Sequence, residues 1–369
     1  RNCAAPRGAG RMRAGDLDLC ARRGQRGAGA ASFGKPVNAE HSMPTILGAR
    51  EILERLVAFP TVSRETNLPL VDWVETYLSG HGVATARVMA PCGTKAHLHA
   101  HVGPEVAGGV LLSGHSDVVP VAGQAWTTDP WTLTERDGRL IGRGTCDMKG
   151  FVALAIAAMV AAAGRPLLRP LQLALSCDEE LGCMAVVDLI AAISGATPKA
   201  GAVIVGEPSM MKVVTGHKGG AGYRVEVRGF EVHSSLLPSG VSAIMEAARL
   251  IDWANRCNAA NADAPPGPLA APFDPPFTTL HVGMIEGGTA HNITARDCRF
   301  VFEMRSVPGE DVAAWAARAE AEAARISADM QARRPGTGIR MERLFTVPAL
   351  VPEAAGAAGR ADAGRADTG

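Results

Sequence analysis

Between residues 109 and 207 the chain contains three apolar runs, each followed within two residues by a histidine or an acidic side chain. The runs are residues 109–114, 171–176 and 202–206, and the polar groups after them are His115-Ser116-Asp117, Asp178-Glu179-Glu180 and Glu207. Such runs are typical of buried strands, and residues 150–163 have the length and composition of a helix. Strands that alternate with helices predict an α/β fold with a mostly parallel sheet covered on both faces. Ligands of such sheets bind at the carboxyl ends of the strands, so these polar groups predict a shared site.

The order of the elements changes after Gly216. Strands are predicted at residues 223–227, 278–284, 298–304 and 339–344, and helices at residues 241–257 and 312–330. This is the order of a β-α-β-β-α-β unit, a compact α+β domain. We therefore expect a metal-binding catalytic domain over residues 43–215, the inserted β-α-β-β-α-β domain over residues 216–347, and an incomplete return to the catalytic domain over residues 348–369.

The N-terminal segment differs from the rest of the chain. Residues 1–33 are rich in Arg, Gly and Ala and contain almost no large apolar side chains, so they cannot bury enough surface to offset the entropy lost on ordering. Two interpretations remain open, an organelle transit peptide or a non-native extension in front of Met43. In both, residues 1–42 are expected to be disordered and outside the fold.

The composition argues against several kinds of partner. Lys plus Arg and Asp plus Glu number 37 each, so no net charge attracts nucleic acid, and a small molecule is the expected partner. The eight cysteines form no Cys-x-x-Cys pair, which favours a reducing compartment and a cytoplasmic location. The most apolar stretch, residues 151–163, is shorter than the roughly 20 residues that cross a bilayer, so no membrane span is expected.

The motif that begins at His115 suggests a metal ligand. His115 and Asp117 are two residues apart at a strand end, so their side chains can point to the same side. In this hypothesis one ring nitrogen of His115 binds the ion, and the Asp117 carboxylate accepts a hydrogen bond from the other. The alternative is a structural histidine.

Further acidic side chains complete the candidate site. Asp147 lies in a glycine-bracketed turn before a helix, where its two oxygens could bridge two cations, although an ordinary helix N-cap has the same pattern. Glu179 and Glu180 are consecutive and point apart, so one could bind metal while the other holds the attacking water. A solvated acidic loop is the alternative for this pair. Glu207, in front of Pro208, would complete the site.

A second group of histidines alternates with apolar residues at His97-Leu98-His99-Ala100-His101. This alternation is typical of a strand with one polar face. We expect a polar edge strand here rather than a metal site.

Five motifs occur in an order that resembles a known family. They are Gly114-His115-Ser116-Asp117-Val118-Val119-Pro120, Trp126-Thr127-Thr128-Asp129-Pro130-Trp131, Gly142-Arg143-Gly144-Thr145-Cys146-Asp147-Met148-Lys149-Gly150, Cys177-Asp178-Glu179-Glu180-Leu181-Gly182-Cys183 and Gly206-Glu207-Pro208. Over residues 43–353 the chain resembles the M20 metallopeptidase family, and within it the acetylornithine deacetylases. The resemblance implies a dizinc exopeptidase-like catalytic domain into which a dimerisation, or lid, domain is inserted.

The resemblance also implies a metal-ligand set. Two Zn²⁺ ions, for which Co²⁺ can substitute, would share Asp147 as a bridging ligand. His115 and Glu207 would complete one ion's site, and Glu180 would bind the other.

The same resemblance assigns catalytic and substrate-binding roles. Glu179 matches the general base, and Asp117, which its spacing places beside His115, is counted with the catalytic residues. His233 matches a histidine that reaches into the partner's active site of a homodimer. Asn292 and Arg305 match substrate-binding positions, and a guanidinium can hold a carboxylate through two parallel hydrogen bonds.

The activity implied by the resemblance is hydrolysis of an N-acyl amino acid. N2-acetyl-L-ornithine would give ornithine and acetate, a step of arginine biosynthesis. Succinyl-diaminopimelate desuccinylase and the glutamate-releasing M20 carboxypeptidases share these metal motifs and remain alternatives.

The end of the chain departs from the family pattern. The family returns to its first domain after the inserted one and supplies a final metal-binding histidine, whereas the last histidine here is His291. Residues 358–369 contain only Ala, Gly, Arg, Asp and Thr. We therefore expect the second metal site to be impaired. A truncated, inactive homologue that only dimerises or binds is the alternative from another class.

Overall fold

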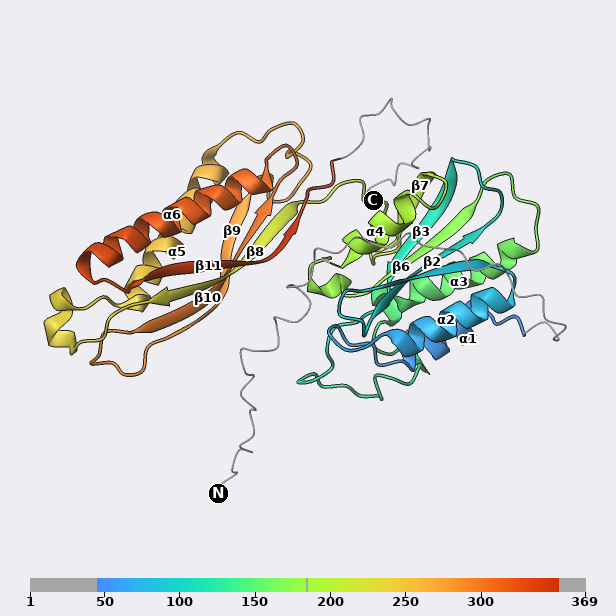
Figure 1. The fold of residues 1–369 in the computed structure, drawn as a ribbon, viewed down its shortest axis with the longest axis horizontal. Helices are drawn as coiled ribbons and strands as arrows, with labels where there is room; N and C mark the ends of the chain where they lie inside the picture. Colours follow the sequence, from blue (N-terminus) through green and yellow to red (C-terminus); the bar gives the residue numbers. More distant parts are fainter. Residues whose placement is uncertain (1–44, 184, 352–369) are drawn as a thin grey trace, which may run out of the picture. The chain divides into compact units, whose positions relative to one another are not determined.

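The computed structural model describes residues 45–183 and 185–351. The contacts of the chain divide it into two compact units, with the division between Pro208 and Ser209 (Figure 1). The expected N-terminal extension and the end of the chain from residue 352 lie outside the described residues. The domain limits given above, including the boundary after residue 215, stay predictions.

The first unit is built on a five-stranded sheet with the order β1-β2-β6-β3-β7. Its strands are β1 (Ala84–Met89), β2 (Ala96–Val102), β6 (Leu171–Ser176), β3 (Gly109–His115) and β7 (Ala200–Val205). Strand β2 is antiparallel to both of its neighbours, whereas β6, β3 and β7 are parallel to one another. All strands of this sheet except β2 therefore run in one direction, and the prediction of a mostly parallel α/β sheet is confirmed.

Helices cover both faces of this sheet (Figure 1). Helices α2 (Leu68–Gly80) and α3 (Gly150–Ala163) pack on one face, α1 (Ala49–Val57) packs against α3, and α4 (Val186–Ser194) lies on the other face. By length and composition alone, Thr145–Ala163 could cross a membrane. Helix α3, however, buries Val152, Ile156 and Met159 in the core of the unit, as the core helix of a globular domain does.

Strand β2 carries the alternating histidines, and the expectation of a polar edge strand is wrong. It lies between β1 and β6, and six of its seven residues are buried. Leu98 and Ala100 belong to the core on one face, so the alternation turns His97, His99 and His101 to the other. Burial lowers the pKa of all three histidines, that of His99 to about 4, so they are neutral core side chains at neutral pH.

The second unit is a four-stranded antiparallel sheet with two helices packed on one face (Figure 1). In chain order it contains β8 (Gly219–Arg228), α5 (Ala243–Asp263), β9 (Thr279–Gly287), β10 (Asp297–Ser306), α6 (Val312–Arg333) and β11 (Gly338–Val347). The predicted β-α-β-β-α-β order is confirmed. Alternate residues of the central strands, such as Tyr223 on β8 and Phe302 on β10, are buried in its core beneath the helices. Burying a side chain such as Phe302 contributes roughly 1.5–3 kcal/mol.

Candidate metal centre

The candidate ligands of the first unit lie where parallel strands end. His115 is the last residue of β3, and Glu207 follows β7 after one glycine. Glu179 and Glu180 begin the short helix η2 (Glu179–Leu181), which follows β6. Asp147 lies in η1 (Thr145–Lys149), directly before α3. Neighbouring parallel strands point the same way, so residues far apart in the sequence reach one edge of the sheet.

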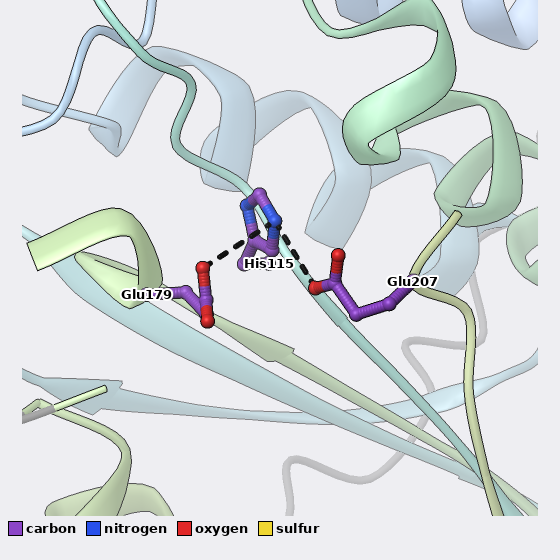
Figure 2. A group of neighbouring side chains, drawn as sticks. All are labelled: His115, Glu179 and Glu207. Carbon is purple, nitrogen blue, oxygen red and sulfur yellow. Dashed lines mark ion pairs between the residues drawn. The ribbon is translucent and has the colours of Figure 1, made fainter. Parts of the chain in front are cut away.

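His115 is the centre of this group (Figure 2). Its Nε2 lies 3.0 Å from Asp147 Oδ1, 3.4 Å from Glu207 Oε1 and 3.8 Å from Glu179 Oε2. Two sets of donor atoms, each within 4.8 Å of one another, share this histidine: one adds Glu179 and Glu207, the other Asp147 and Glu180. All four predicted metal ligands thus come together, and His115 is common to both sets. The bridging role of Asp147 stays a prediction.

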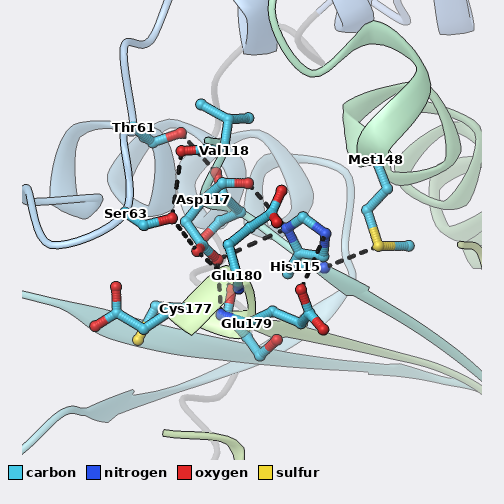
Figure 3. A network of polar contacts seen from close by, with 12 residues as sticks. Thr61, Ser63, His115, Asp117, Val118, Met148, Cys177, Glu179 and Glu180 are labelled. Carbon is cyan, nitrogen blue, oxygen red and sulfur yellow. Dashed lines mark hydrogen bonds and ion pairs between the residues drawn. The ribbon is translucent and has the colours of Figure 1, made fainter. Parts of the chain in front are cut away.

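A backbone hydrogen bond orients the ring of His115 (Figure 3). Nδ1 lies 2.8 Å from the main-chain oxygen of Asp117 and 3.6 Å from its carboxylate Oδ1. The nearer partner is therefore the carbonyl and not the carboxylate that the sequence suggested. If Nδ1 donates to this carbonyl in the neutral ring, Nε2 keeps its lone pair and faces the carboxylates, as a metal ligand requires.

The Asp117 carboxylate organises the acidic turn instead (Figure 3). Its Oδ1 accepts the main-chain N–H of Glu179 at 3.1 Å, and its Oδ2 accepts that of Glu180 at 3.4 Å. The Ser63 hydroxyl donates to Oδ2 at 2.7 Å. Asp117 is 3% exposed, so these donors stabilise a charge that water does not solvate. It acts on the site through the backbone of the two glutamates.

The electrostatics of the group favour a cation. Burial by itself lowers the pKa of His115, but the hydrogen bond with Glu207 and the nearby carboxylates raise it to about 9. Burial, and then the negative charge of Asp147, raise the pKa of Glu180 to about 7. Carboxylates this close repel one another unless a proton or a cation neutralises them. One imidazole nitrogen among several carboxylate oxygens is a donor set that fits Zn²⁺ or Co²⁺.

The turn that carries Glu179 and Glu180 is held at both ends. Asp178 has a left-handed backbone (φ 55°, ψ 34°), and its Oδ1 accepts a hydrogen bond from Lys95 Nζ at 2.5 Å. At the other end the Cys183 thiol donates to Glu179 Oε1 at 3.1 Å. Burial, the hydrogen bond to Glu179 and nearby negative charges raise the pKa of Cys183 to about 12, so the thiol keeps its proton at neutral pH.

Sequence reasoning missed both Lys95 and Cys183 as parts of the site. Lys95 lies 83 residues from Asp178 and belongs to none of the motifs. Cys183 is four residues after Glu179, the spacing of one helical turn, and that spacing was an available signal.

A third overlooked residue, Lys149, supports the turn that carries Asp147. It is fully buried, and its Nζ donates to the main-chain oxygens of Leu56 and Phe59 at 2.9 and 2.7 Å. Burial lowers the pKa of Lys149 to about 7, although the negative charge of Asp117 by itself raises it. The ammonium thereby ties η1 to the carboxyl end of α1.

The residue between β7 and Glu207 must be a glycine. A Cβ on Gly206 would lie 1.9 Å from Cγ of Phe151, on α3, which is far inside van der Waals contact. The backbone that delivers Glu207 therefore passes directly beneath an aromatic ring, and no other residue fits there without moving it.

The remaining predicted site residues belong to the second unit, where all three are exposed. His233 is the N-cap of the short helix η3 (Ser234–Ser239), and its Nδ1 lies 2.8 Å from the Ser235 hydroxyl. Asn292 is next to it, because its main-chain oxygen accepts the N–H of Ser234 at 2.9 Å. Arg305 lies at the far end of β10 on the open face of the sheet, where its guanidinium pairs with Glu303.

Comparisons with known proteins place this geometry in a family. Residues 111–338 match the family model described as Peptidase family M20/M25/M40. A relative named acetylornithine deacetylase, from Myxococcus xanthus, is 40% identical over 273 residues, which cover 72% of this chain and 69% of the relative.

Two solved structures support the fold. A metallo-carboxypeptidase of the M20 family from Sulfolobus solfataricus matches with a TM-score of 0.64 at 16% identity, covering 80% of this chain and 77% of that one. A dinuclear metal-binding M20 peptidase from Bacillus subtilis matches with a TM-score of 0.53 at 14% identity, covering 82% and 74%. The chain therefore belongs to peptidase family M20/M25/M40, whose members are metal-dependent amidohydrolases.

Proposed function

We propose that this protein is a metal-dependent deacylase that hydrolyses N2-acetyl-L-ornithine to ornithine and acetate, in the cytoplasmic pathway of arginine biosynthesis. The observation that carries the proposal is the cluster of carboxylates around His115 Nε2 at the ends of parallel strands. The choice of substrate rests on the relative named acetylornithine deacetylase.

Two Zn²⁺ ions, or Co²⁺ in their place, would be held by His115, Asp147, Glu180 and Glu207. Bound there, they would lower the pKa of water and polarise the acyl carbonyl. The chain supplies an imidazole fixed by the Asp117 carbonyl and carboxylates fixed by a buried network. Ligands that are already oriented need little reorganisation when an ion binds.

Glu179 is the proposed general base. It takes a proton from the attacking water and passes that proton to the amine as the amide C–N bond breaks, so acetate and the free amine leave. The Cys183 thiol holds Glu179 Oε1, and Oε2 lies on the side of His115. Because Glu179 is partly exposed, substrate and water can reach it.

His233 and Arg305 would serve different ends of the reaction. His233 would donate a hydrogen bond to the oxyanion of the acyl group, and Arg305 would hold the substrate carboxylate. Nearly all of β10 separates the two within one unit, roughly 30 Å of strand at about 3.3 Å per residue. An amino-acid substrate is much shorter, so one unit cannot present both to one molecule. This supports a homodimer in which His233 and Asn292 come from the partner.

Metal analysis together with substrate comparison tests the proposal. The protein is loaded with Zn²⁺ or Co²⁺, and its rates on N2-acetyl-L-ornithine, N-succinyl-diaminopimelate and a folate-like glutamate amide are compared. We expect metal to bind and the acetyl substrate to be fastest, with Glu179→Gln lowering kcat by about 10²–10⁴-fold at unchanged metal content. If the succinyl substrate were hydrolysed fastest, the protein would be a desuccinylase, and if the folate-like amide were fastest, it would be a glutamate-releasing carboxypeptidase. Loss of metal binding and of all turnover would favour the inactive, dimerising homologue.

A further inference from the structure

The turn that carries Glu179 and Glu180 begins at a residue in an unusual backbone conformation. Asp178 lies in the left-handed region, where a residue other than glycine is uncommon and persists when its surroundings hold it. The next two residues are the proposed general base and a proposed metal ligand. Whatever holds Asp178 therefore sets the direction in which both carboxylates leave the backbone.

Lys95 is the group that holds the Asp178 side chain. Its Nζ lies 2.5 Å from Asp178 Oδ1, and the two side chains are only 4% and 15% exposed. The same oxygen accepts the main-chain N–H of Arg64 at 3.2 Å. A buried pair with additional hydrogen bonds has a defined geometry, unlike an ion pair on the surface.

The backbone of Lys95 is itself fixed. Its main-chain oxygen accepts the N–H of Ala90 at 2.9 Å, which closes the turn between β1 and β2. The next residue, Ala96, is bonded on both its N–H and its carbonyl by the side chain of Asn67, at 3.0 and 2.8 Å. The ammonium thus projects from a rigid part of the sheet rather than from a free loop.

We propose that Lys95 is a positioning residue that acts through Asp178. It holds one side of the turn while the Asp117 carboxylate holds the other through the N–H groups of Glu179 and Glu180. This inference rests on the proposed function, in which Glu179 is the base and Glu180 a metal ligand. Without the ammonium, the Asp178 side chain keeps the hydrogen bond from the Arg64 N–H but loses its tie to the sheet, so it leaves its position and the turn that follows rotates.

The test compares Lys95→Met with a matched control, Arg87→Met. Arg87, on β1, also makes ion pairs in the first unit, with Asp72 and Glu75 of α2, but it belongs to no part of the site. For Lys95→Met we expect kcat to fall about 10–100-fold with little change in KM, and Co²⁺ to dissociate about 10–100-fold more readily in a spectroscopic titration. Arg87→Met should keep the wild-type kcat and Co²⁺ affinity, whatever it does to stability.

A second variant covers the case in which Lys95→Met does not fold. Lys95→Met/Asp178→Asn removes both charges, and asparagine tolerates the left-handed backbone, so no unpaired charge stays buried. We expect it to fold and still to lose Co²⁺ affinity and kcat. Wild-type values in the double variant, or losses in either Lys95 variant no larger than in Arg87→Met, would overturn the inference. If wild-type protein proves inactive on every acyl substrate, the proposed function fails, and the Co²⁺ titrations alone still decide the role of Lys95.

Discussion

The two units hold their candidate catalytic histidines in different ways. His115, in the first unit, is 1% exposed, and both ring nitrogens have partners from a carbonyl and from carboxylates on other elements. His233, in the second unit, is exposed, and its ring bonds with Ser235 two residues further along. A histidine at a strand end is fixed before any ligand arrives. An exposed histidine on a short turn acquires its function from what binds against it.

Of the two histidines, His115 should show the larger effect when replaced, because it belongs to both candidate ligand sets. We expect His115→Ala to lower turnover on the order of 10³-fold, since a bound metal supplies several kcal/mol of transition-state stabilisation. Metal content, measured by elemental analysis, should fall with it. His281→Ala, which changes an exposed histidine of β9, is the control. Wild-type metal content in His115→Ala would remove this histidine from the site.

Replacing His233 should separate catalysis from metal binding. His233→Ala is expected to lower kcat by about 10²–10³-fold, the cost of losing one oxyanion donor, while metal content stays that of the wild type. Kinetics and elemental analysis on the same preparation measure both quantities. A loss of metal would show that the contrast between the two histidines is wrong.

Mixing two impaired variants sharpens the comparison further. If His233 serves the partner's site, a heterodimer of His233→Ala and Glu179→Gln contains one site with both groups intact. When the two variants are mixed in equal amounts and re-associate at random, half of the dimers are heterodimers. Each heterodimer has one intact site out of two, so the mixture should recover about a quarter of the wild-type rate. No recovery, despite exchange of subunits, would indicate that His233 acts within its own chain.

Acid should weaken the first unit through its buried histidines. The folded pKa of His99 is about 4, below its value near 6.5 in the unfolded chain, so the unfolded state takes up the proton first. Stability is therefore lost as pH falls from 6.5 to 4, by about 3 kcal/mol for this residue, and no further below 4. Urea unfolding of metal-free protein at several pH values should show a shallower dependence for His99→Gln. An unchanged dependence would mean that His99 is not the buried neutral side chain described.

The smallest effect is expected at Cys183. Cys183→Ala removes the donor to Glu179 Oε1, worth about 1 kcal/mol, and should lower kcat roughly fivefold. Cys183→Ser keeps a donor and should retain most of the rate. Cys92→Ala, at a thiol in the turn between β1 and β2, controls for loss of a cysteine. Equal rates for the Ala and Ser variants at position 183 would argue against the hydrogen bond.

The pattern of apolar runs predicted most of the helices and strands. Residues 171–176 are β6 and residues 150–163 are α3, and both lie in the core. Residues 202–205 are a strand as predicted, but the expectation that this strand is buried is wrong, because β7 is the edge strand of the described sheet and its apolar side chains are exposed. Strands β1 and β2 were harder to predict. The histidines of β2 look like a polar face, and only the cover of α4 over that side of the sheet makes them buried.

The sequence predicted which side chains meet but not through which atoms. The two-residue spacing of His115 and Asp117 is correct for contact, yet the nearer oxygen is the carbonyl, because the carboxylate turns toward the N–H groups of Glu179 and Glu180. Lys95 and Asp178 could not be paired from sequence, since their contact depends on the register of β2 against β6. Local patterns identify residue types, whereas long-range packing selects the partners.

At Gly206 the site would be damaged by adding a side chain, whereas at the ligands it is damaged by removing one. Every variant discussed so far takes a group away, but a single methyl at position 206 would collide with the ring of Phe151 and displace the strand end that carries Glu207. A random mutation there damages the centre whatever side chain it introduces. In a mutational scan, position 206 should tolerate as few replacements as the ligands themselves, although it contributes no atom to the chemistry.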